Sequence, residues 1–177
     1  MKSVALVIGH GPTKDQGAYS KDKRVSELQW NRAFVPIVAS ELKKLGVEYW
    51  VLERRTEKRS PIATINVTGA QACCEFHLNS ADGQPSGTEM IYYPGSVKGA
   101  KLGRAMQKAA VTILQLPDRG IRTPYAGRGM AFLRDTKMPA IIVETFFICT
   151  PGDLQRGTAV RYPLAVAYAQ ALANLKL

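Results

Sequence analysis

Short strand-like runs alternate with longer helical segments along almost the whole chain, and this alternation limits the folds that the chain can adopt. The first run, residues 4–8, is entirely apolar and is ended by Gly9 and Gly11. Further strand-like runs cover 47–52, 73–78, 88–93, 130–133 and 140–143. Strands that are apolar along their length are buried on both faces, as in a parallel sheet covered by helices. We therefore predict an α/β fold, a single domain with a central, largely parallel twisted sheet of about six strands and helices on both faces.

Four segments between these runs carry helix signals. A helix over residues 25–45 should stop at Gly46, and Pro36 inside it should bend it. A second helix should begin with Ser60 as N-cap and Pro61 at its first position. The remaining predicted helices cover 97–116 and 159–175. The stretch 117–129 is rich in Gly and Pro, so we expect a mobile loop there.

The charge balance is strongly basic, with 24 Lys and Arg against 14 Asp and Glu and a net charge of +10. Such a chain is attracted to polyanions. The basic residues are scattered rather than gathered in one run, and the aromatic residues are dispersed among apolar positions, so we expect no nucleic-acid partner. The apolar start, residues 4–8, is shorter than the core of a signal peptide, and no stretch approaches the roughly 18 apolar residues that span a bilayer. We expect no export signal and no membrane insertion.

The three cysteines form neither an even disulfide framework nor a CxxC pair of zinc ligands. Cys73 and Cys74 are adjacent, and Cys149 stands alone. We expect buried free thiols.

Both histidines of the chain, His10 and His77, stand at or just beyond the end of a predicted strand. In an open α/β sheet, ligands bind outside the carboxyl ends of the strands, so both imidazoles should reach the same edge and could share a metal. The alternative is that each is a hydrogen-bonded structural histidine near the core.

Two carboxylates could complete such a site. Glu144 ends the apolar strand at 140–143, where its alternative role is a salt bridge just beyond the strand. Glu27 lies in the first turn of the first helix, on the same face as Asn31, and the helix dipole alone would favour a carboxylate there. Two histidines and one carboxylate make a zinc site with a fourth position open for water, and the other carboxylate can serve as general base. This set of groups suits amide hydrolysis.

The residues around these positions resemble one enzyme family. Residues 6–11, LVIGHG, followed by Asp15 and Gly17-Ala18, are similar to the D-x-GHGG…D-x-GA opening of the zinc-dependent N-acetylmuramoyl-L-alanine amidases of the amidase-3 type. Glu27 with Asn31 resembles the E-x-x-x-N helix start of that family. Residues 76–79 resemble its S-x-H-x-N strand end, 87–89 its G-x-E step, and 138–148 its P-A-v-L-v-E-x-G-F-i-s-N segment. The resemblance covers essentially the whole chain.

By this resemblance His10, Glu27 and His77 would hold the zinc and Glu144 would be the catalytic acid and base. Asn79 would support a ligand or contact the substrate, or it would cap its own turn. The chain departs from the family pattern at four positions without losing a ligand. Glu75 replaces a small serine, and the other three departures are Ile8, Thr145 and Cys149.

The expected protein is therefore a zinc amidase that cleaves the bond between the lactyl group of muramic acid and L-alanine in peptidoglycan. We expect residues 1–177 to form one catalytic domain without a separate wall-binding domain, and the protein to act as a monomer. The absence of an export signal is typical of a phage or prophage endolysin, which is made in the cytoplasm and reaches the wall after release. Two alternatives remain open: a zinc peptidase or deacylase acting on another amide, and a basic binding module for envelope or nucleic acid without catalysis.

Overall fold

The computed structural model describes residues 1–11, 14–54, 61–124 and 130–177. Six strands form one sheet in the order β2-β1-β3-β6-β4-β5, and all neighbours are parallel except β4 and β6. The predicted α/β fold with a largely parallel sheet is confirmed. The strands are β1 (Ser3–Ile8), β2 (Glu48–Glu53), β3 (Cys73–Asn79), β4 (Thr88–Tyr92), β5 (Asp118–Arg122) and β6 (Ala140–Phe147). The helices are α1 (Glu27–Lys44), α2 (Ile62–Thr68), α3 (Val97–Leu114), α4 (Met130–Asp135), α5 (Pro151–Ala159) and α6 (Arg161–Asn174).

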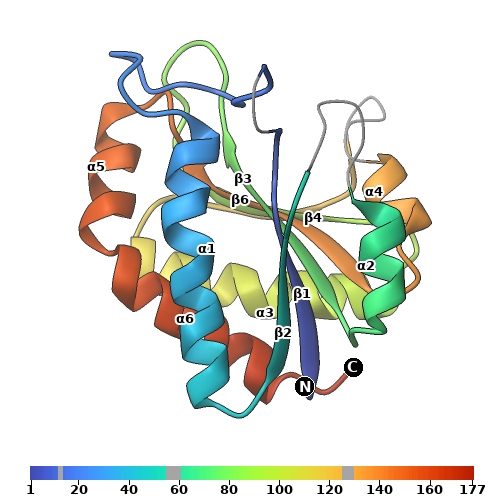
Figure 1. Cartoon of the computed structure of the whole chain (residues 1–177). Helices are drawn as coiled ribbons and strands as arrows, with labels where there is room; N and C mark the ends of the chain where they lie inside the picture. The colour runs from blue at the N-terminus through green and yellow to red at the C-terminus, as the bar shows by residue number, and fades with distance from the viewer. Residues whose placement is uncertain (12–13, 55–60, 125–129) are drawn as a thin grey trace.

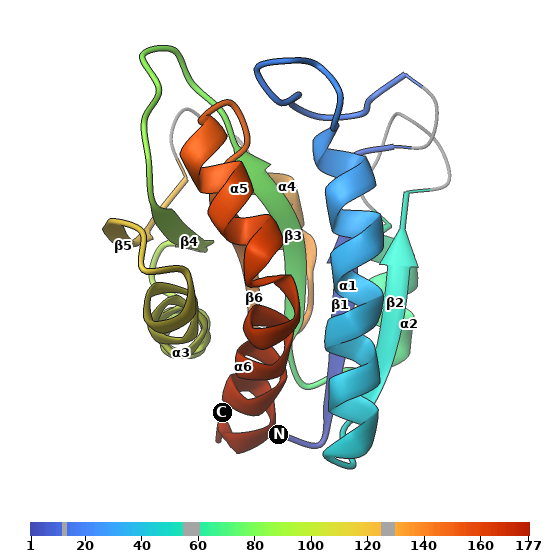
Figure 2. The same cartoon turned by 90° about the vertical axis from the view of Figure 1, so that its left-hand side faces the viewer.

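The sheet separates two helical layers, which Figures 1 and 2 show from two sides. Helices α1, α3 and α6 cover one face, over a large core that includes the packed rings of Trp30, Phe34, Phe76 and Tyr168. Helices α2 and α4 cover the other face over a smaller apolar core that includes Ile65. The prediction of helices on both faces is therefore confirmed.

Helix α1 begins with a capping box that fixes where its first residue lies. Ser26 accepts from the backbone N–H of Gln29, and the Gln29 side chain accepts from the Ser26 N–H. Pro36 lies inside the helix, which continues to Lys44 although proline has no N–H for the preceding turn. The capping box thus places Glu27 at the first helical position.

Two sequence predictions about secondary structure were wrong. Residues 130–133, predicted as a strand, begin helix α4, because so short an apolar run carries no reliable period. The expected loop at 117–129 contains the edge strand β5, which is polar and gains its order by pairing with β4. The predicted last helix, 159–175, is confirmed as α6, but the separate helix α5, which begins at Pro151, was not predicted. The remainder of that loop, 125–129, and the predicted cap Ser60 lie outside the described residues.

Cys73 and Cys74 are buried free thiols, as expected, whereas Cys149 is free but only partly buried. None of the helices in the described part of the chain is long and apolar enough to cross a membrane.

Helix α5 is held against β6 by a contact that admits no side chain at Gly157. A Cβ at Gly157 would lie 2.3 Å from Cε1 of Phe146. The Phe146 ring is fully buried and packs edge-on against Trp30 at 5.0 Å, so it has little room to move. Overpacking at this contact should cost about 1–3 kcal/mol. The roughly 1 kcal/mol that alanine gains over glycine in a helix offsets part of that cost, so we expect Gly157→Ala to lower the free energy of unfolding by up to about 2 kcal/mol.

Chemical denaturation with a matched control measures this effect. Gly152 lies in the same helix, and a Cβ there meets nothing within 4 Å. Gly152→Ala should keep or slightly raise the stability. Equal stabilities for the two variants would contradict the proposed contact.

Candidate active site

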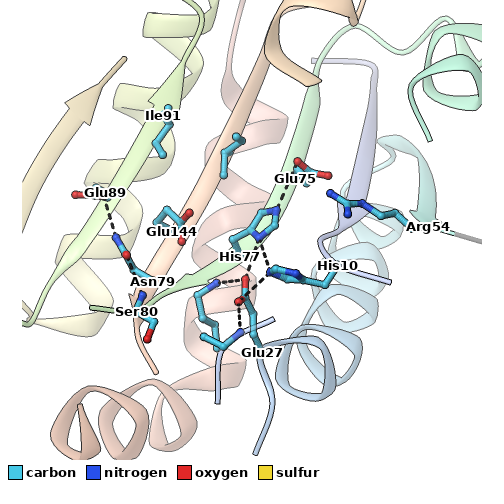
Figure 3. Close-up of a pocket in the computed structure, with 13 residues that line it drawn as sticks. His10, Glu27, Arg54, Glu75, His77, Asn79, Ser80, Glu89, Ile91 and Glu144 are labelled. Atoms are coloured by element: carbon cyan, nitrogen blue, oxygen red, sulfur yellow. Dashed lines mark hydrogen bonds and ion pairs between the residues drawn. The ribbon is translucent and has the colours of Figure 1, made fainter. Parts of the chain in front are cut away.

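Polar side chains gather at one end of the sheet, on the face that carries α2 and α4. In β3, Phe76 and Leu78 enter the large core, so the alternating residues Glu75 and His77 point to the opposite face. Glu144 of β6 stands in register with His77. These side chains line a cavity of about 500 Å³ (Figure 3). The other lining residues include His10, Glu27, Arg54, Asn79, Glu89, Ile91 and Ile142.

Three of the predicted site residues meet at short distances. His10 Nε2 lies 3.0 Å from Glu27 Oε2, and His77 Nδ1 lies 2.9 Å from Glu27 Oε1. The two ring nitrogens lie 3.2 Å apart, and the rings stand edge to face at 76°. One donor atom from each residue lies within 4.8 Å of the others. The structure thus brings His10, Glu27 and His77 together from three separate segments, as predicted.

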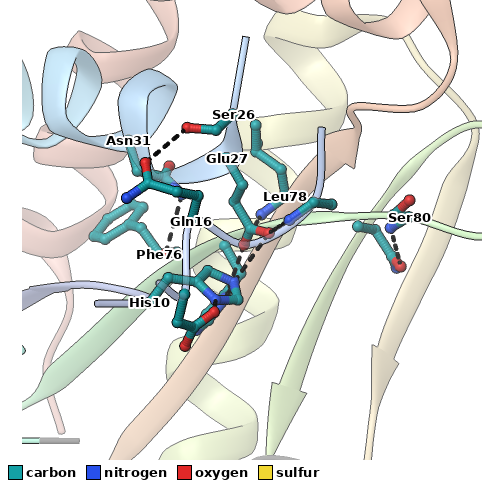
Figure 4. Close-up of polar contacts among 12 residues, drawn as sticks. His10, Gln16, Ser26, Glu27, Asn31, Phe76, Leu78 and Ser80 are labelled. Atoms are coloured by element: carbon teal, nitrogen blue, oxygen red, sulfur yellow. Dashed lines mark hydrogen bonds and ion pairs between the residues drawn. The ribbon is translucent and has the colours of Figure 1, made fainter. Parts of the chain in front are cut away.

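Glu27 is fixed by backbone groups as well as by the imidazoles (Figure 4). Its Oε1 accepts from the Leu78 N–H at 2.8 Å, and its Oε2 accepts from the Ala18 N–H at 3.0 Å. Asn31, one turn further along α1, donates to the Phe76 carbonyl and ties the helix to β3. Glu27 is only 3% exposed, so it is a buried member of the site rather than a surface residue that merely favours the helix dipole.

The outer nitrogen of each imidazole faces a further carboxylate. His10 Nδ1 lies 2.7 Å from Asp15 Oδ1, and Asp15 Oδ2 accepts from Arg54 at 3.2 Å. His77 Nε2 lies 3.5 Å from Glu75 Oε2. Carboxylates in this position orient an imidazole and make its inner nitrogen a better metal ligand. The inner nitrogens, Nε2 of His10 and Nδ1 of His77, both face Glu27.

Gly9 and Gly17 lack side chains at positions where a Cβ would collide with the site. A Cβ at Gly9 would lie 2.3 Å from His77 Cε1. A Cβ at Gly17 would lie 2.5 Å from Glu27 Oε2, and Gly17 also has a φ of +73°. His10 itself has a φ of +70°, which is strained for a residue with a side chain. Such strain is concentrated at functional sites, because surrounding contacts must maintain it.

The cluster is strongly coupled electrostatically. Burial by itself lowers the pKa of both imidazoles and raises the pKa of Glu27. The hydrogen bonds and opposite charges within the cluster outweigh burial. They lower the pKa of Glu27 to about 2, raise that of His77 well above its usual value, and raise that of His10.

Glu144 stands beside this cluster in a different environment. Its Oε2 is enclosed and has no hydrogen-bond partner among the described residues. Burial raises the pKa of Glu144 to about 7; His77 opposes this shift, and the charges of Glu27 and Glu89 add to it. A cation held by the cluster would lower this pKa, since it favours the carboxylate. A carboxyl group with a pKa near neutrality can both accept and release a proton.

Asn79 lines the cavity and has a partner on each side of its amide. Its Nδ2 donates to Glu89 Oε1 at 3.0 Å, and its Oδ1 accepts from the Ser80 N–H at 2.9 Å. It therefore does cap its own turn, and it also holds Glu89. Glu89 in turn accepts from Arg119 Nε at 2.8 Å.

Sequence reasoning assigned no role to Glu75, Asp15, Glu89 or Arg54, all of which contact or line the site. Glu75 could have been found, because a charged residue two positions before a strand-end histidine shares its face. The pairing of Arg54 with Asp15 could not have been found from the sequence, because Asp15 lies in the loop after β1 and Arg54 follows the end of β2.

The residues present fit a divalent metal such as zinc. They offer two imidazole nitrogens and one carboxylate within reach of a common point, with both outer nitrogens next to carboxylates.

Comparison with known proteins agrees with the geometry. A solved catalytic domain of the CD27L endolysin targeting Clostridia Difficile is similar to the chain, with 22% identity, coverage of 100% of this chain and 99% of that one, and a TM-score of 0.85. An N-acetylmuramoyl-L-alanine amidase from Clostridium difficile 630 has 26% identity, 97% and 94% coverage, and a TM-score of 0.82. The match to the amidase AmiC2 of Nostoc punctiforme has 23% identity, covers 97% of this chain and 94% of that one, and has a TM-score of 0.83. No curated protein sequence matches the chain. The Amidase_3 family model, described as N-acetylmuramoyl-L-alanine amidase, matches residues 4–174, and the chain belongs to this family.

Proposed function

We propose that this chain is a zinc hydrolase that cleaves the amide bond between the muramic acid lactyl group and L-alanine in peptidoglycan. One observation carries the proposal: the His10, Glu27 and His77 donors converge beside Glu144, whose Oε2 is enclosed and unpartnered among the described residues. Membership of the amidase family supplies the substrate class. His10, Glu27 and His77 would hold the metal.

Zinc in such a site supplies Lewis-acid activation of the amide carbonyl and of the attacking water. Glu144 removes a proton from the water as the water oxygen bonds to the carbonyl carbon of the amide. It then delivers that proton to the amide nitrogen as the carbon–nitrogen bond breaks, so a carboxylic acid and an amine leave. Proton transfer of this kind typically contributes about 10²–10⁴-fold to the rate. With zinc bound, the pKa of Glu144 would fall below the value that burial gives it, which favours the carboxylate form that accepts the first proton.

Two hydrogen bonds fix Glu89, which lies beside Glu144 in the cavity wall. Asn79 and Arg119 both donate to Glu89, which fixes the position of that carboxylate beside Glu144. We propose that Asn79 acts in this way, as a support of the cavity wall, and contacts the substrate only at its edge. Arg54 has the corresponding position at the other end of the cavity, through Asp15 and His10.

The proposed place of action is the bacterial wall, after release of the protein as an endolysin. Likeness to an endolysin catalytic domain supports this. We propose that the chain acts as a monomer, since His10, Glu27, His77 and Glu144 line one cavity within a single copy. A peptidase or deacylase activity on another amide is separated from this proposal by assay on isolated peptidoglycan. A purely binding module is disfavoured, because binding alone does not require the His10, Glu27 and His77 donors to converge in one cavity with Glu144.

We predict that the protein binds one zinc ion and releases protons on binding. Zinc takes neutral imidazole, whereas the raised pKa values of His77 and His10 keep protons on the free site. The zinc affinity should therefore fall as the pH falls, by about tenfold per pH unit for each proton displaced. Elemental analysis gives the stoichiometry, and chelator competition between about pH 6 and about pH 8 gives the affinity.

His10→Ala and His77→Ala should lose metal and activity together. Full activity after complete removal of metal would refute the zinc site.

We predict that Glu144→Gln keeps the zinc and the fold but loses most turnover. Glutamine copies the shape of the carboxylate and cannot accept a proton, so the rate should fall by about 10²–10⁴-fold. The measurement is the rate of amine release from a soluble muramyl peptide, with metal content and thermal unfolding as controls. Turnover within a few-fold of the parent would remove Glu144 from the mechanism.

We predict that activity on whole walls falls steeply with salt, whereas activity on a short muramyl peptide hardly changes. Helix α3 displays four exposed cations, Lys98, Lys101, Arg104 and Lys108, and contains no Asp or Glu. None of the four forms an ion pair with the residues that the structure describes. Attraction of this surface to carboxylates and phosphates of the wall weakens as the Debye length shrinks from ~10 Å at 0.1 M to ~3 Å at 1 M.

A pair of charge-matched variants locates the effect. Lys101→Gln with Lys108→Gln removes two cations from α3, and Lys21→Gln with Lys43→Gln removes two exposed cations elsewhere. We expect the α3 variant to lose more wall activity at low salt, with equal rates on the soluble peptide. Parallel salt curves for wall and peptide would mean that the positive surface plays no part in wall capture.

A further inference from the structure

Glu75 is a carboxylate in a place where a carboxylate is unfavourable. It lies in the middle of the sheet on β3, between the fully buried Cys74 and Phe76, and is itself only 2% exposed. A buried carboxylate must be compensated by a cation or by hydrogen bonds, since its desolvation is costly. The amidase-3 pattern has a small serine at this position, so this chain maintains a charge that the pattern does not require.

The side chain of Glu75 faces the imidazole of His77 (Figure 3). Residues two apart on a strand share a face, so the two side chains are neighbours on the cavity floor. Glu75 Oε2 lies 3.5 Å from His77 Nε2, the outer ring nitrogen. The inner nitrogen, Nδ1, points the other way, to Glu27 and His10.

This orientation decides which tautomer can bind a metal. If Nδ1 donates its lone pair to the metal, the remaining proton must be on Nε2, where it points at Glu75. His10 has the mirror arrangement, with Nε2 inward and Nδ1 2.7 Å from Asp15. Each imidazole of the cluster therefore has a carboxylate behind it.

We propose that Glu75 is a positioning residue that holds His77 in the tautomer and ring orientation required for metal binding. Its negative charge stabilises the positive charge that the imidazole gains on coordination, which a serine hydroxyl cannot do. Glu75 thus performs for His77 the role that Asp15 performs for His10. The inference rests on the proposed metal site, and it adds to that site a residue whose charge sets the metal affinity.

The test measures metal affinity and stability separately from catalysis. Glu75→Ser restores the family residue, and Glu75→Gln retains an oxygen that can accept from Nε2 without its charge. We expect the zinc affinity, measured by chelator competition at constant pH, to fall about 10–100-fold in Glu75→Ser and by less in Glu75→Gln. Glu48→Ser, an exposed site on β2, is the control and should keep the parent affinity.

A second measurement separates positioning from packing. Thermal unfolding with and without zinc gives the stabilisation that the metal adds, and this increment should shrink in Glu75→Ser by the same free energy as the affinity. An affinity equal to the parent's in Glu75→Ser would overturn the proposal. So would a lower unfolding temperature of the metal-free protein accompanied by an unchanged zinc increment, because that result describes packing alone. A parent protein that binds zinc but releases no amine from peptidoglycan would contradict the proposed function and leave the role of Glu75 intact.

Discussion

The site depends on one buried carboxylate, Glu27, which joins three segments that are distant in the sequence. Its two oxygens contact the imidazoles of His10 and His77 and accept backbone N–H groups from Ala18 and Leu78. Burial opposes the charge, and these partners outweigh burial strongly enough to lower the pKa of Glu27 to about 2. His10 has a strained backbone and Gly17 has no side chain, and both features allow close approach to Glu27.

The cavity arises where the smaller apolar core ends. Along the face that carries α2 and α4, β6 changes from Ala140 and Ile142 to Glu144 as the strand proceeds. In β4, which is antiparallel to β6, the order is reversed, so that Glu89 precedes Ile91 and still pairs with Glu144. Polar groups from strands of both directions thus meet at one level of the sheet, above the apolar residues that support them.

The sequence predicts the parts of this site that follow from local rules. His10, His77 and Glu144 are found because the carboxyl ends of parallel strands share an edge. Glu27 is placed in the first turn of the first helix by the helical pattern, and its role as a ligand comes from the resemblance to the amidase family. Prediction from the sequence fails where order comes from distant partners. The polar edge strand β5 exists by pairing with β4, and the short apolar run at the start of α4 has no period that separates helix from strand. The contacts between carboxylates and arginines are of the same kind, since they join residues such as Asp15 and Arg54 across loops.

These long-range pairs explain why one carboxylate in the cavity differs from the rest. Asp15 is paired with Arg54 at one end, and Glu89 with Arg119 and Arg122 at the other. Glu27 lies between imidazoles, and Glu75 lies behind one of them. Each of these carboxylates has a basic partner in the described part of the site. Among the carboxylate oxygens that the structure describes, only Oε2 of Glu144 is buried without a hydrogen bond, and burial raises the pKa of this residue to about 7. The surrounding carboxylates are thus occupied by their partners, whereas Oε2 of Glu144 has none among the described residues. A substitution that unpaired Glu89 or Asp15 would disturb this division of roles even though neither residue needs to touch the scissile bond.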